Sequence, residues 1–204
     1  MAGNVLIVTA PSGAGKTSLV SAMLAHDSRV RLSVSYTTRA PRLGETHGRD
    51  YHFVNQSEFI AKLEAGEFLE SAEVYGHYYG TSEHWIREQI ALEDDVLLEI
   101  DWQGAQQVRQ LFPQSIGIFI MPPSFEVLRQ RLLSRGQDDK ATVERRLAAA
   151  CSDVSHAVEF DYVIINDNFE TAVTDLLAVV RTQRLRGHEQ IQHHTALFAA
   201  FNIS

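Results

Sequence analysis

Residues 4–17 read NVLIVTAPSGAGKT and contain three patterns in succession. The continuous aliphatic and β-branched run Asn4–Thr9 is typical of a strand that is buried on both faces. The glycine-rich residues after it indicate a turn, and Lys16–Leu24 has the spacing of a helix. The stretch therefore predicts a strand, a loop and a helix, which is the repeating unit of a parallel α/β sheet.

The same alternation recurs along the rest of the chain. Three further apolar runs are typical of strands, namely Val96–Asp101, Ile116–Met121 and Tyr162–Asn166. Each is followed by a helical pattern, at residues 105–111, 125–133 and 170–185. We therefore expect an α/β fold in which a parallel sheet core is flanked by helices.

Two segments interrupt the alternation. Residues 33–92 hold short alternating runs, many turn residues and a helix near Ser57–Leu63, so we expect an inserted α+β lobe there. The charged residues from Ser134 to Ala150 suit a mobile helical flap rather than core, and we expect a helical lid over residues 124–146. The core would then comprise residues 1–32, 93–123 and 147–204.

Composition excludes several classes of protein. With 18 Lys and Arg against 26 Asp and Glu, the net charge of −8 argues against a protein that coats nucleic acid. The longest apolar runs fall short of the ~20 residues of a membrane span, so we expect no membrane partner. The single cysteine, Cys151, excludes an intrachain disulfide and a cysteine-based zinc site, which suits a reducing, cytoplasmic location.

The glycine-rich turn matches the spacing of a Walker A phosphate-binding loop, except that alanine replaces the first glycine. The residues of this loop are Ala10, Pro11, Ser12, Gly13, Ala14, Gly15, Lys16 and Thr17. Its backbone N–H groups and the following helix N-terminus favour an anion. Lys16 would reach the β and γ phosphates of a bound nucleotide, and Thr17 would give its hydroxyl to Mg²⁺. The alternative is a glycine-rich turn without a ligand.

A second basic segment lies between residues 35 and 53. It places Arg39 and Arg42 close to Tyr51 in a turn-rich stretch. Two guanidinium groups can grip a phosphate dianion through paired hydrogen bonds, and a tyrosine hydroxyl can add another. Taken alone, the Arg-x-x-Arg spacing is more typical of a solvated basic loop.

Further motifs follow in order, and together with the two segments above they resemble the guanylate kinase family. These motifs are FLE at 68–70, YYGT at 78–81, IDWQG at 100–104, RLLSRG at 131–136 and IND at 165–167. The resemblance runs through almost the whole chain. It implies the fold of a P-loop nucleoside monophosphate kinase, with a GMP-binding insertion and a helical lid. It also implies an enzyme that phosphorylates GMP and dGMP with ATP and Mg²⁺.

The resemblance also implies roles for individual residues. The GMP phosphate would be held by Arg39, Arg42, Tyr51 and Tyr79, and guanine would be read by Ser35, Glu70 and Thr81. Glu99 and Asp101 end the strand beside the site and would complete the GMP site. The family usually has Asp at the first position, so Glu99 is one carbon longer than expected, and it would contact the nucleotide or ordered water. Asp101 would lie either at the guanine edge or in the Mg²⁺ shell. The catalytic groups would be Lys16 and the lid arginines Arg131, Arg135 and Arg146. Asn166 matches a position near the adenine of ATP.

The chemistry of guanine agrees with the expected reader. Guanine offers N1–H and N2–H₂ as adjacent donors, which the Glu70 carboxylate can accept as a pair, while Ser35 and Thr81 can donate to O6. Adenine would set an acceptor against the carboxylate, and such mismatches discriminate strongly. The acceptor phosphate is itself a nucleophile, so positioning and charge neutralisation suffice for catalysis.

Two other functions compete with this interpretation. A noncatalytic guanylate-kinase-like module would bind phosphopeptides, but such modules usually lose the P-loop lysine and the lid arginines that this chain keeps. A related P-loop small-molecule kinase would lack Ser35, Glu70 and Thr81. The apolar tail ALFAAF, residues 196–201, is compatible with docking on the domain or on a second subunit, so a homo-oligomer stays open.

Overall fold

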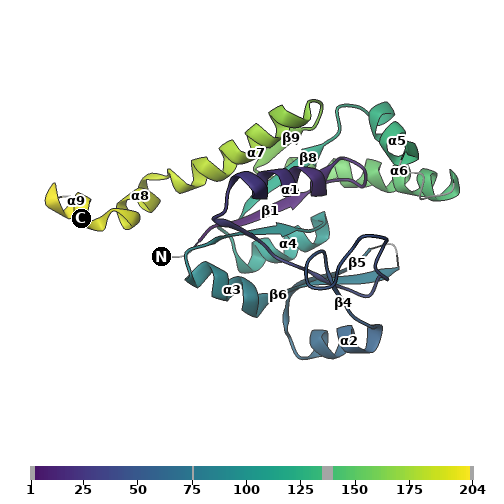
Figure 1. Cartoon of the computed structure of the whole chain (residues 1–204), viewed down its shortest axis with the longest axis horizontal. Helices are drawn as coiled ribbons and strands as arrows, with labels where there is room; N and C mark the ends of the chain where they lie inside the picture. Colours follow the sequence, from purple (N-terminus) through teal and green to yellow (C-terminus); the bar gives the residue numbers. More distant parts are fainter. Residues whose placement is uncertain (1–2, 75, 135–139, 203–204) are drawn as a thin grey trace.

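The computed structural model describes residues 3–74, 76–134 and 140–202. Its core is a five-stranded parallel sheet in the order β2-β7-β1-β8-β9 (Figure 1). Strand β1 (Val5–Thr9) is central, between β7 (Asp95–Glu99) and β8 (Ile116–Met121). The edges are β2 (Val30–Leu32) and β9 (Tyr162–Ile165). The predicted parallel α/β core is therefore confirmed.

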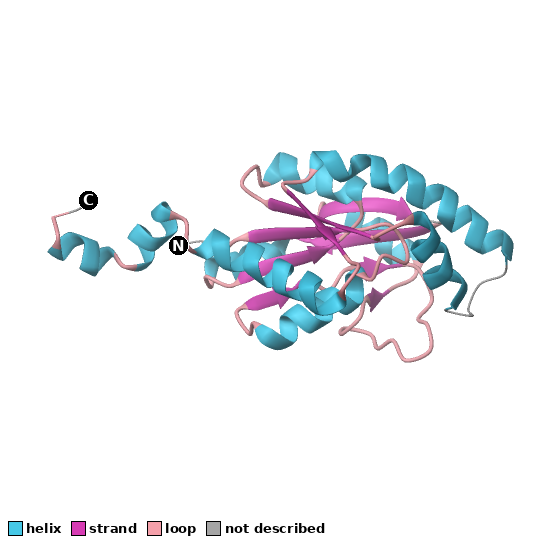
Figure 2. Cartoon of the chain, turned by 90° about the horizontal axis from the view of Figure 1, so that it is seen from above, coloured by secondary structure: helices cyan, strands magenta, loops and turns pink. Residues whose placement is uncertain are grey.

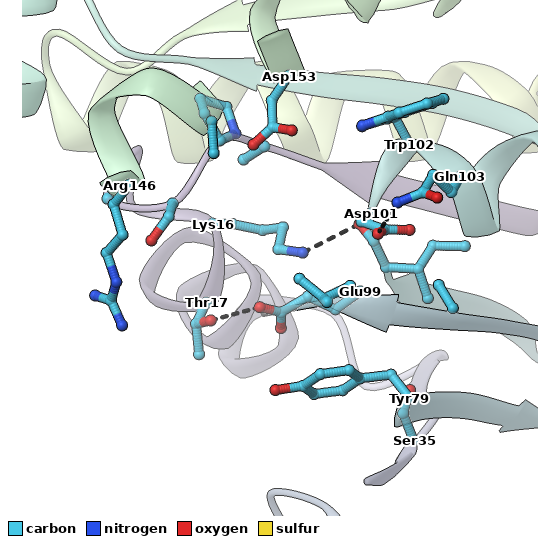
Figure 3. A pocket seen from close by; sticks show the side chains of 18 of the residues that line it. Lys16, Thr17, Ser35, Tyr79, Glu99, Asp101, Trp102, Gln103, Arg146 and Asp153 are labelled. Atoms are coloured by element: carbon cyan, nitrogen blue, oxygen red, sulfur yellow. Dashed lines mark hydrogen bonds between the residues drawn. The ribbon is translucent and has the colours of Figure 1, made fainter. Parts of the chain in front are cut away.

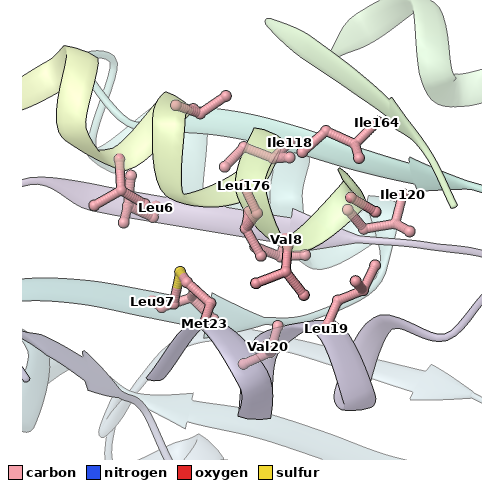
Figure 4. Close-up of a cluster of buried hydrophobic side chains, with 14 of the residues drawn as sticks. Leu6, Val8, Leu19, Val20, Met23, Leu97, Ile118, Ile120, Ile164 and Leu176 are labelled. Atoms are coloured by element: carbon pink, nitrogen blue, oxygen red, sulfur yellow. The ribbon is translucent and has the colours of Figure 1, made fainter. Parts of the chain in front are cut away.

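Alternate residues of β1 pack on opposite faces of the sheet. Leu6 and Val8 belong to a buried cluster with α1 (Lys16–His26) and α7 (Phe169–Arg184), shown in Figure 4. Both side chains are fully buried. Because successive strand residues point to opposite faces, this helix pair covers one side of the sheet only.

The other face of the sheet packs against a second pair of helices. Val5 and Ile7 form a cluster with residues of α3 (Glu83–Ala91) and α4 (Trp102–Leu111). Burial on both faces explains why the strand sequences are continuous apolar runs instead of alternating ones.

The inserted segment forms a smaller mixed sheet in the order β4-β3-β6-β5. Its strands are β3 (Tyr36–Thr37), β4 (His52–Phe53), β5 (Phe68–Val74) and β6 (His77–Ser82), and α2 (Gln56–Glu64) packs against it (Figure 1). All of these elements lie within the predicted 33–92 lobe, but α3 packs on the core sheet. The proposed domain boundaries stay a prediction.

The predicted lid, residues 124–146, covers α5 (Phe125–Ser134) and the first part of α6 (Lys140–Ser155). Helix α6 continues past it into a 3₁₀ turn, η1 (His156–Glu159). Leu147 and Ala150 of α6 are buried against α5. The segment is helical as expected, and these two residues, just beyond the expected end of the lid at residue 146, pack on α5 rather than in the clusters that cover the sheet. Its role as a mobile lid stays a prediction.

The chain ends in two short helices that lie away from the core. Helices α8 (Gly187–His193) and α9 (Thr195–Ala200) have no buried residues, and Figure 2 shows them beyond the end of α7. The apolar tail at 196–201 is thus not docked on its own domain. Within the described part of the chain, no helix combines the length and the apolar character that crossing a bilayer requires.

Candidate active site

A cavity of about 440 Å³ opens where the carboxyl ends of the core strands face the small sheet. This edge is the usual ligand site of parallel α/β sheets. Most residues predicted from the sequence line it, as Figure 3 shows for those it labels. The predicted residues along its wall are Ala10, Pro11, Ser12, Gly13, Gly15, Lys16, Thr17, Ser35, Arg42, Tyr51, Glu70, Tyr79, Glu99, Asp101 and Arg146.

The phosphate-binding loop depends on two glycines with left-handed backbones. Gly13 has φ 94° and Gly15 has φ 95°. A Cβ at Gly13 would lie 2.9 Å from the Leu132 side chain, and one at Gly15 would collide with the amide of Asn166. Helix α1 begins after Gly15 without a side-chain cap. Its first N–H groups are therefore available to an anion.

The side chains of the last two loop residues, Lys16 and Thr17, lie against the end of β7. Lys16 Nζ donates to the carbonyl oxygen of Ile100 at 3.1 Å, and Thr17 donates its hydroxyl hydrogen bond to Glu99. The Thr17 hydroxyl and the Glu99 carboxylate are hard oxygen ligands of the kind Mg²⁺ prefers. Among the described residues, no group of three or more His, Cys, Asp or Glu side chains could hold a metal ion.

The three residues expected to read guanine form one buried cluster. The Thr81 hydroxyl donates to Glu70 Oε1 at 2.5 Å and lies 3.3 Å from the Ser35 hydroxyl. Glu70 is only 4% exposed. Burial raises the pKa of Glu70 to about 7, and the nearby charge of Asp101 adds to this shift. The cluster therefore holds a carboxylate whose charge changes near neutral pH.

The residues expected to hold the GMP phosphate lie near one another, but only three of the four line the cavity. Arg39 pairs with Glu45 at 2.8 Å, and its guanidinium lies 5.4 Å from the centre of the Tyr51 ring. Glu45 also accepts from the Arg42 backbone N–H at 2.7 Å. Burial raises the pKa of Tyr51 to about 12, so its hydroxyl stays a neutral donor. Tyr79 packs edge-on against Tyr51 at 5.9 Å. Arg39 itself does not line the cavity.

Two predicted residues support the phosphate-binding loop from behind. Asn166 Nδ2 donates to the Ala14 carbonyl oxygen at 2.7 Å. Arg131 donates to the Asn166 carbonyl oxygen at 2.9 Å and to the Ala14 oxygen at 3.4 Å. Neither side chain lines the cavity, so direct contact with ATP stays a prediction for both. Arg135 lies outside the described residues.

Comparison with known proteins agrees with this geometry. The family model for guanylate kinase matches residues 2–183. The chain belongs to the guanylate kinase family. Guanylate kinase of Thiobacillus denitrificans is 58% identical over 98% of this chain and 95% of its own length, and that of Dechloromonas aromatica is 59% identical over 97% and 98%. The crystal structure of guanylate kinase from Anaplasma phagocytophilum matches with a TM-score of 0.79 at 32% identity, covering 100% of this chain and 97% of that one.

Sequence reasoning missed part of the cavity wall of this guanylate kinase family member. Asp153 lines the cavity two helical turns after Arg146, and their spacing of seven residues on α6 is a signal that could have found it. Burial and the charge of Asp101 raise the pKa of Asp153, which accepts a hydrogen bond from Trp102. The Trp102 indole stacks on His156 with ring centres 3.6 Å apart. These contacts join α6 to the start of α4.

Asp101 caps the N-terminus of α4, which the apolar pattern of the strand before it did not indicate. Strand β7 ends at Glu99, and Asp101 is the N-cap of α4, where its Oδ1 accepts from the Gly104 N–H at 2.9 Å. One Asp101 oxygen is therefore occupied by the helix. Its proposed place at the guanine edge or in the Mg²⁺ shell stays open.

Proposed function

We propose that this nucleoside monophosphate kinase transfers the γ-phosphoryl group of ATP to the phosphate of GMP or dGMP, giving ADP and GDP or dGDP. The observation that supports this best is that the phosphate-binding loop and Glu70 line the same cavity. With ATP phosphates on the loop and guanine at Glu70, the phosphate of GMP would face the γ-phosphate within this one cavity, as in-line transfer requires.

Recognition of the base would rest on the buried cluster. Ionised Glu70 would accept from N1–H and N2–H₂ of guanine, and the Ser35 hydroxyl would donate to O6. The single hydroxyl hydrogen of Thr81 would stay on Glu70 and position its carboxylate. The Thr81 hydroxyl already donates to Glu70, so the cluster is organised before the base arrives. Buried polar groups that an adenine base would leave mismatched provide the discrimination.

The acceptor phosphate would be held by Arg39, Arg42, Tyr51 and Tyr79. Arg42, Tyr51 and Tyr79 line the cavity, and Arg39 is fixed behind them by Glu45. The Glu45 carboxylate also anchors the Arg42 backbone, so the basic turn is held as one unit. Charge-assisted bonds from this set would neutralise and orient the nucleophilic phosphate.

The donor phosphates would lie on the loop at residues 10–17. On nucleotide binding, Lys16 would exchange its bond to the Ile100 carbonyl for the β and γ phosphates. Thr17 and Glu99 supply oxygen atoms that fit Mg²⁺, directly or through water. When bound with ATP, Mg²⁺ neutralises charge on the phosphates. Asn166 would contribute near the adenine end.

Transfer needs no general base, because the GMP phosphate is a nucleophile as a dianion. The residues of this chain therefore act by positioning and by charge. Arg131, Arg135 and Arg146 would neutralise charge on the transferring group once the lid closes, and Arg146 already lines the cavity. Closure would also exclude water and limit wasteful ATP hydrolysis.

With one cysteine, Cys151, we place the enzyme in the reducing cytoplasm.

A coupled assay of ADP formation tests the proposal. GMP, dGMP, AMP, CMP and UMP are offered separately as acceptors with ATP and Mg²⁺. We expect turnover with GMP and dGMP that exceeds turnover with the others by several orders of magnitude. Binding of GMP without ADP formation would instead support a noncatalytic module, and equal turnover with AMP would contradict guanine reading.

A further inference from the structure

Gly104 lies in the first turn of α4 at a position where its backbone does not require glycine. Its φ is not in the left-handed range, in contrast to that of Gly13. Glycine is a poor helix former, and an alanine here would favour α4. The lack of space for a side chain explains the glycine, because a Cβ on Gly104 would lie 2.6 Å from Glu70 Oε2 and 3.2 Å from Glu70 Cδ. The missing side chain leaves room for a carboxylate.

Glu70 cannot move aside freely. Its other oxygen, Oε1, accepts the hydrogen bond from Thr81 at 2.5 Å, and the side chain is buried. The backbone beside it is pinned to the same helix, because Gln107 of α4 donates to the Ser71 carbonyl oxygen at 2.9 Å and accepts from the Ser71 N–H at 3.1 Å. An added Cβ would thus meet a carboxylate that is held on both sides.

The contact also sets the electrostatic surroundings of Glu70. The Gly104 N–H donates to Asp101, so the first turn of α4 brings Asp101 and Glu70 close together. The positive end of the helix favours both carboxylates there, while their mutual repulsion opposes it. A shift of Glu70 away from Gly104 would change both its attraction to the helix end and its repulsion by Asp101. It would also turn the two carboxylate oxygen atoms of Glu70 to a new direction.

We propose that Gly104 is a positioning residue for guanine specificity, because the absence of its side chain lets the Glu70 carboxylate lie against α4 in the orientation that accepts both guanine donors. This inference rests on the proposed function, in which Glu70 reads the base. Gly104 touches no substrate in this scheme and acts only through Glu70.

The first test is Gly104→Ala, assayed with GMP and with inosine monophosphate, which lacks the N2 amine. Ordinary contact distances of 3.4 Å or more would force the Glu70 carboxylate to shift. We expect kcat/KM for GMP to fall by about ten- to a hundredfold, the preference for GMP over inosine monophosphate to shrink, and KM for ATP to stay unchanged. Gly187→Ala is the matched control, because that helical glycine has open space around it, and it should leave all constants unchanged.

A second test asks whether the effect depends on the length of residue 70. Glu70→Asp withdraws the carboxylate by one carbon, so Gly104→Ala should cost little further activity in that background. An equal loss in both backgrounds, or wild-type GMP preference in Gly104→Ala, would overturn the proposal. If Gly104→Ala fails to fold, a folded double variant would support the clash with Glu70, and an unfolded double variant would contradict it.

Glu70→Gln separates this inference from the proposed function. If Glu70→Gln loses the GMP preference while Gly104→Ala keeps it, Glu70 reads guanine but Gly104 does not position it. If Glu70→Gln keeps the wild-type preference for GMP over inosine monophosphate, the guanine-reading role of Glu70 fails, and the inference about Gly104 fails with it.

Discussion

The side-chain amide of Asn166 donates a 2.7 Å hydrogen bond to the carbonyl oxygen of Ala14, although the two residues lie 152 positions apart. The end of β9 thereby holds the back of the phosphate-binding loop. Asn166 also fills the space that a Cβ on Gly15 would need. The loop conformation therefore depends on a partner from the far end of the sheet as well as on its own glycines.

This contact predicts that Asn166→Ala damages both stability and ATP binding. Losing the donor leaves a buried carbonyl short of a partner, which should lower the free energy of unfolding by about 1–3 kcal/mol. KM for ATP should rise while KM for GMP stays close to wild type. Urea denaturation and steady-state kinetics measure both effects. Asn168→Ala is the matched control, because it removes the N-cap of α7 at a cost of about 1 kcal/mol without touching the loop.

Lys16→Met should abolish turnover and leave GMP binding intact. Lys16 is the cation proposed to neutralise the β and γ phosphates, and methionine keeps an unbranched side chain of nearly the same length without its charge. Calorimetric titration with GMP, together with the ADP assay, checks the two statements. Lys62→Met removes another lysine, one that pairs with Glu67 away from the cavity, and should be active. Turnover in Lys16→Met would contradict the assignment of the loop.

Arg42→Ala should raise KM for GMP by about tenfold or more and leave KM for ATP nearly unchanged. A charge-assisted hydrogen bond to the phosphate contributes about 1.5–3 kcal/mol, which corresponds to this factor. Arg49 belongs to the same turn-rich segment but is exposed and pairs with Asp50. Arg49→Ala should therefore leave KM for GMP unchanged. Equal damage to both KM values in Arg42→Ala would indicate a misplaced phosphate site or a folding defect.

The raised pKa of Glu70, about 7, predicts a pH dependence of GMP use. Only the ionised carboxylate offers two acceptors, so kcat/KM for GMP should fall as pH drops through 7, by about tenfold per unit at the acid limit. Burial and Asp101 raise this pKa, while Thr81 and Lys16 oppose the shift. The GMP phosphate titrates near pH 6 and adds its own slope. Glu70→Gln should remove the component near pH 7 and keep the phosphate component.

Most of the core fold could be predicted from local patterns. Strand β1 and helix α1 lie where the apolar run and the helical spacing placed them, because each of these patterns is visible within a few consecutive residues. Strand β2 was not predicted, since its three residues are too few to show a period. Strand β7 ends at Glu99, two residues before the end expected at Asp101, because Asp101 instead caps α4.

The site divides in the same way. The two glycines, Lys16 and Thr17 lie within five residues, so the sequence alone was enough to predict an anion-binding loop at residues 10–17. Arg39, Arg42 and Tyr51 also lie close together in the sequence, within residues 35–53, so their place in one lobe could be predicted.

Tertiary packing decided the contacts between distant elements. Glu70 lies beside Gly104 because β5 packs on α4, and Asn166 supports Ala14 because β9 joins the sheet. Asp153 lines the cavity where it accepts a hydrogen bond from Trp102, the first residue of α4. A local pattern reports which face of its own element a residue occupies. It carries no information about which other element covers that face, because this depends on side-chain volumes and hydrogen bonds that meet only in the folded chain.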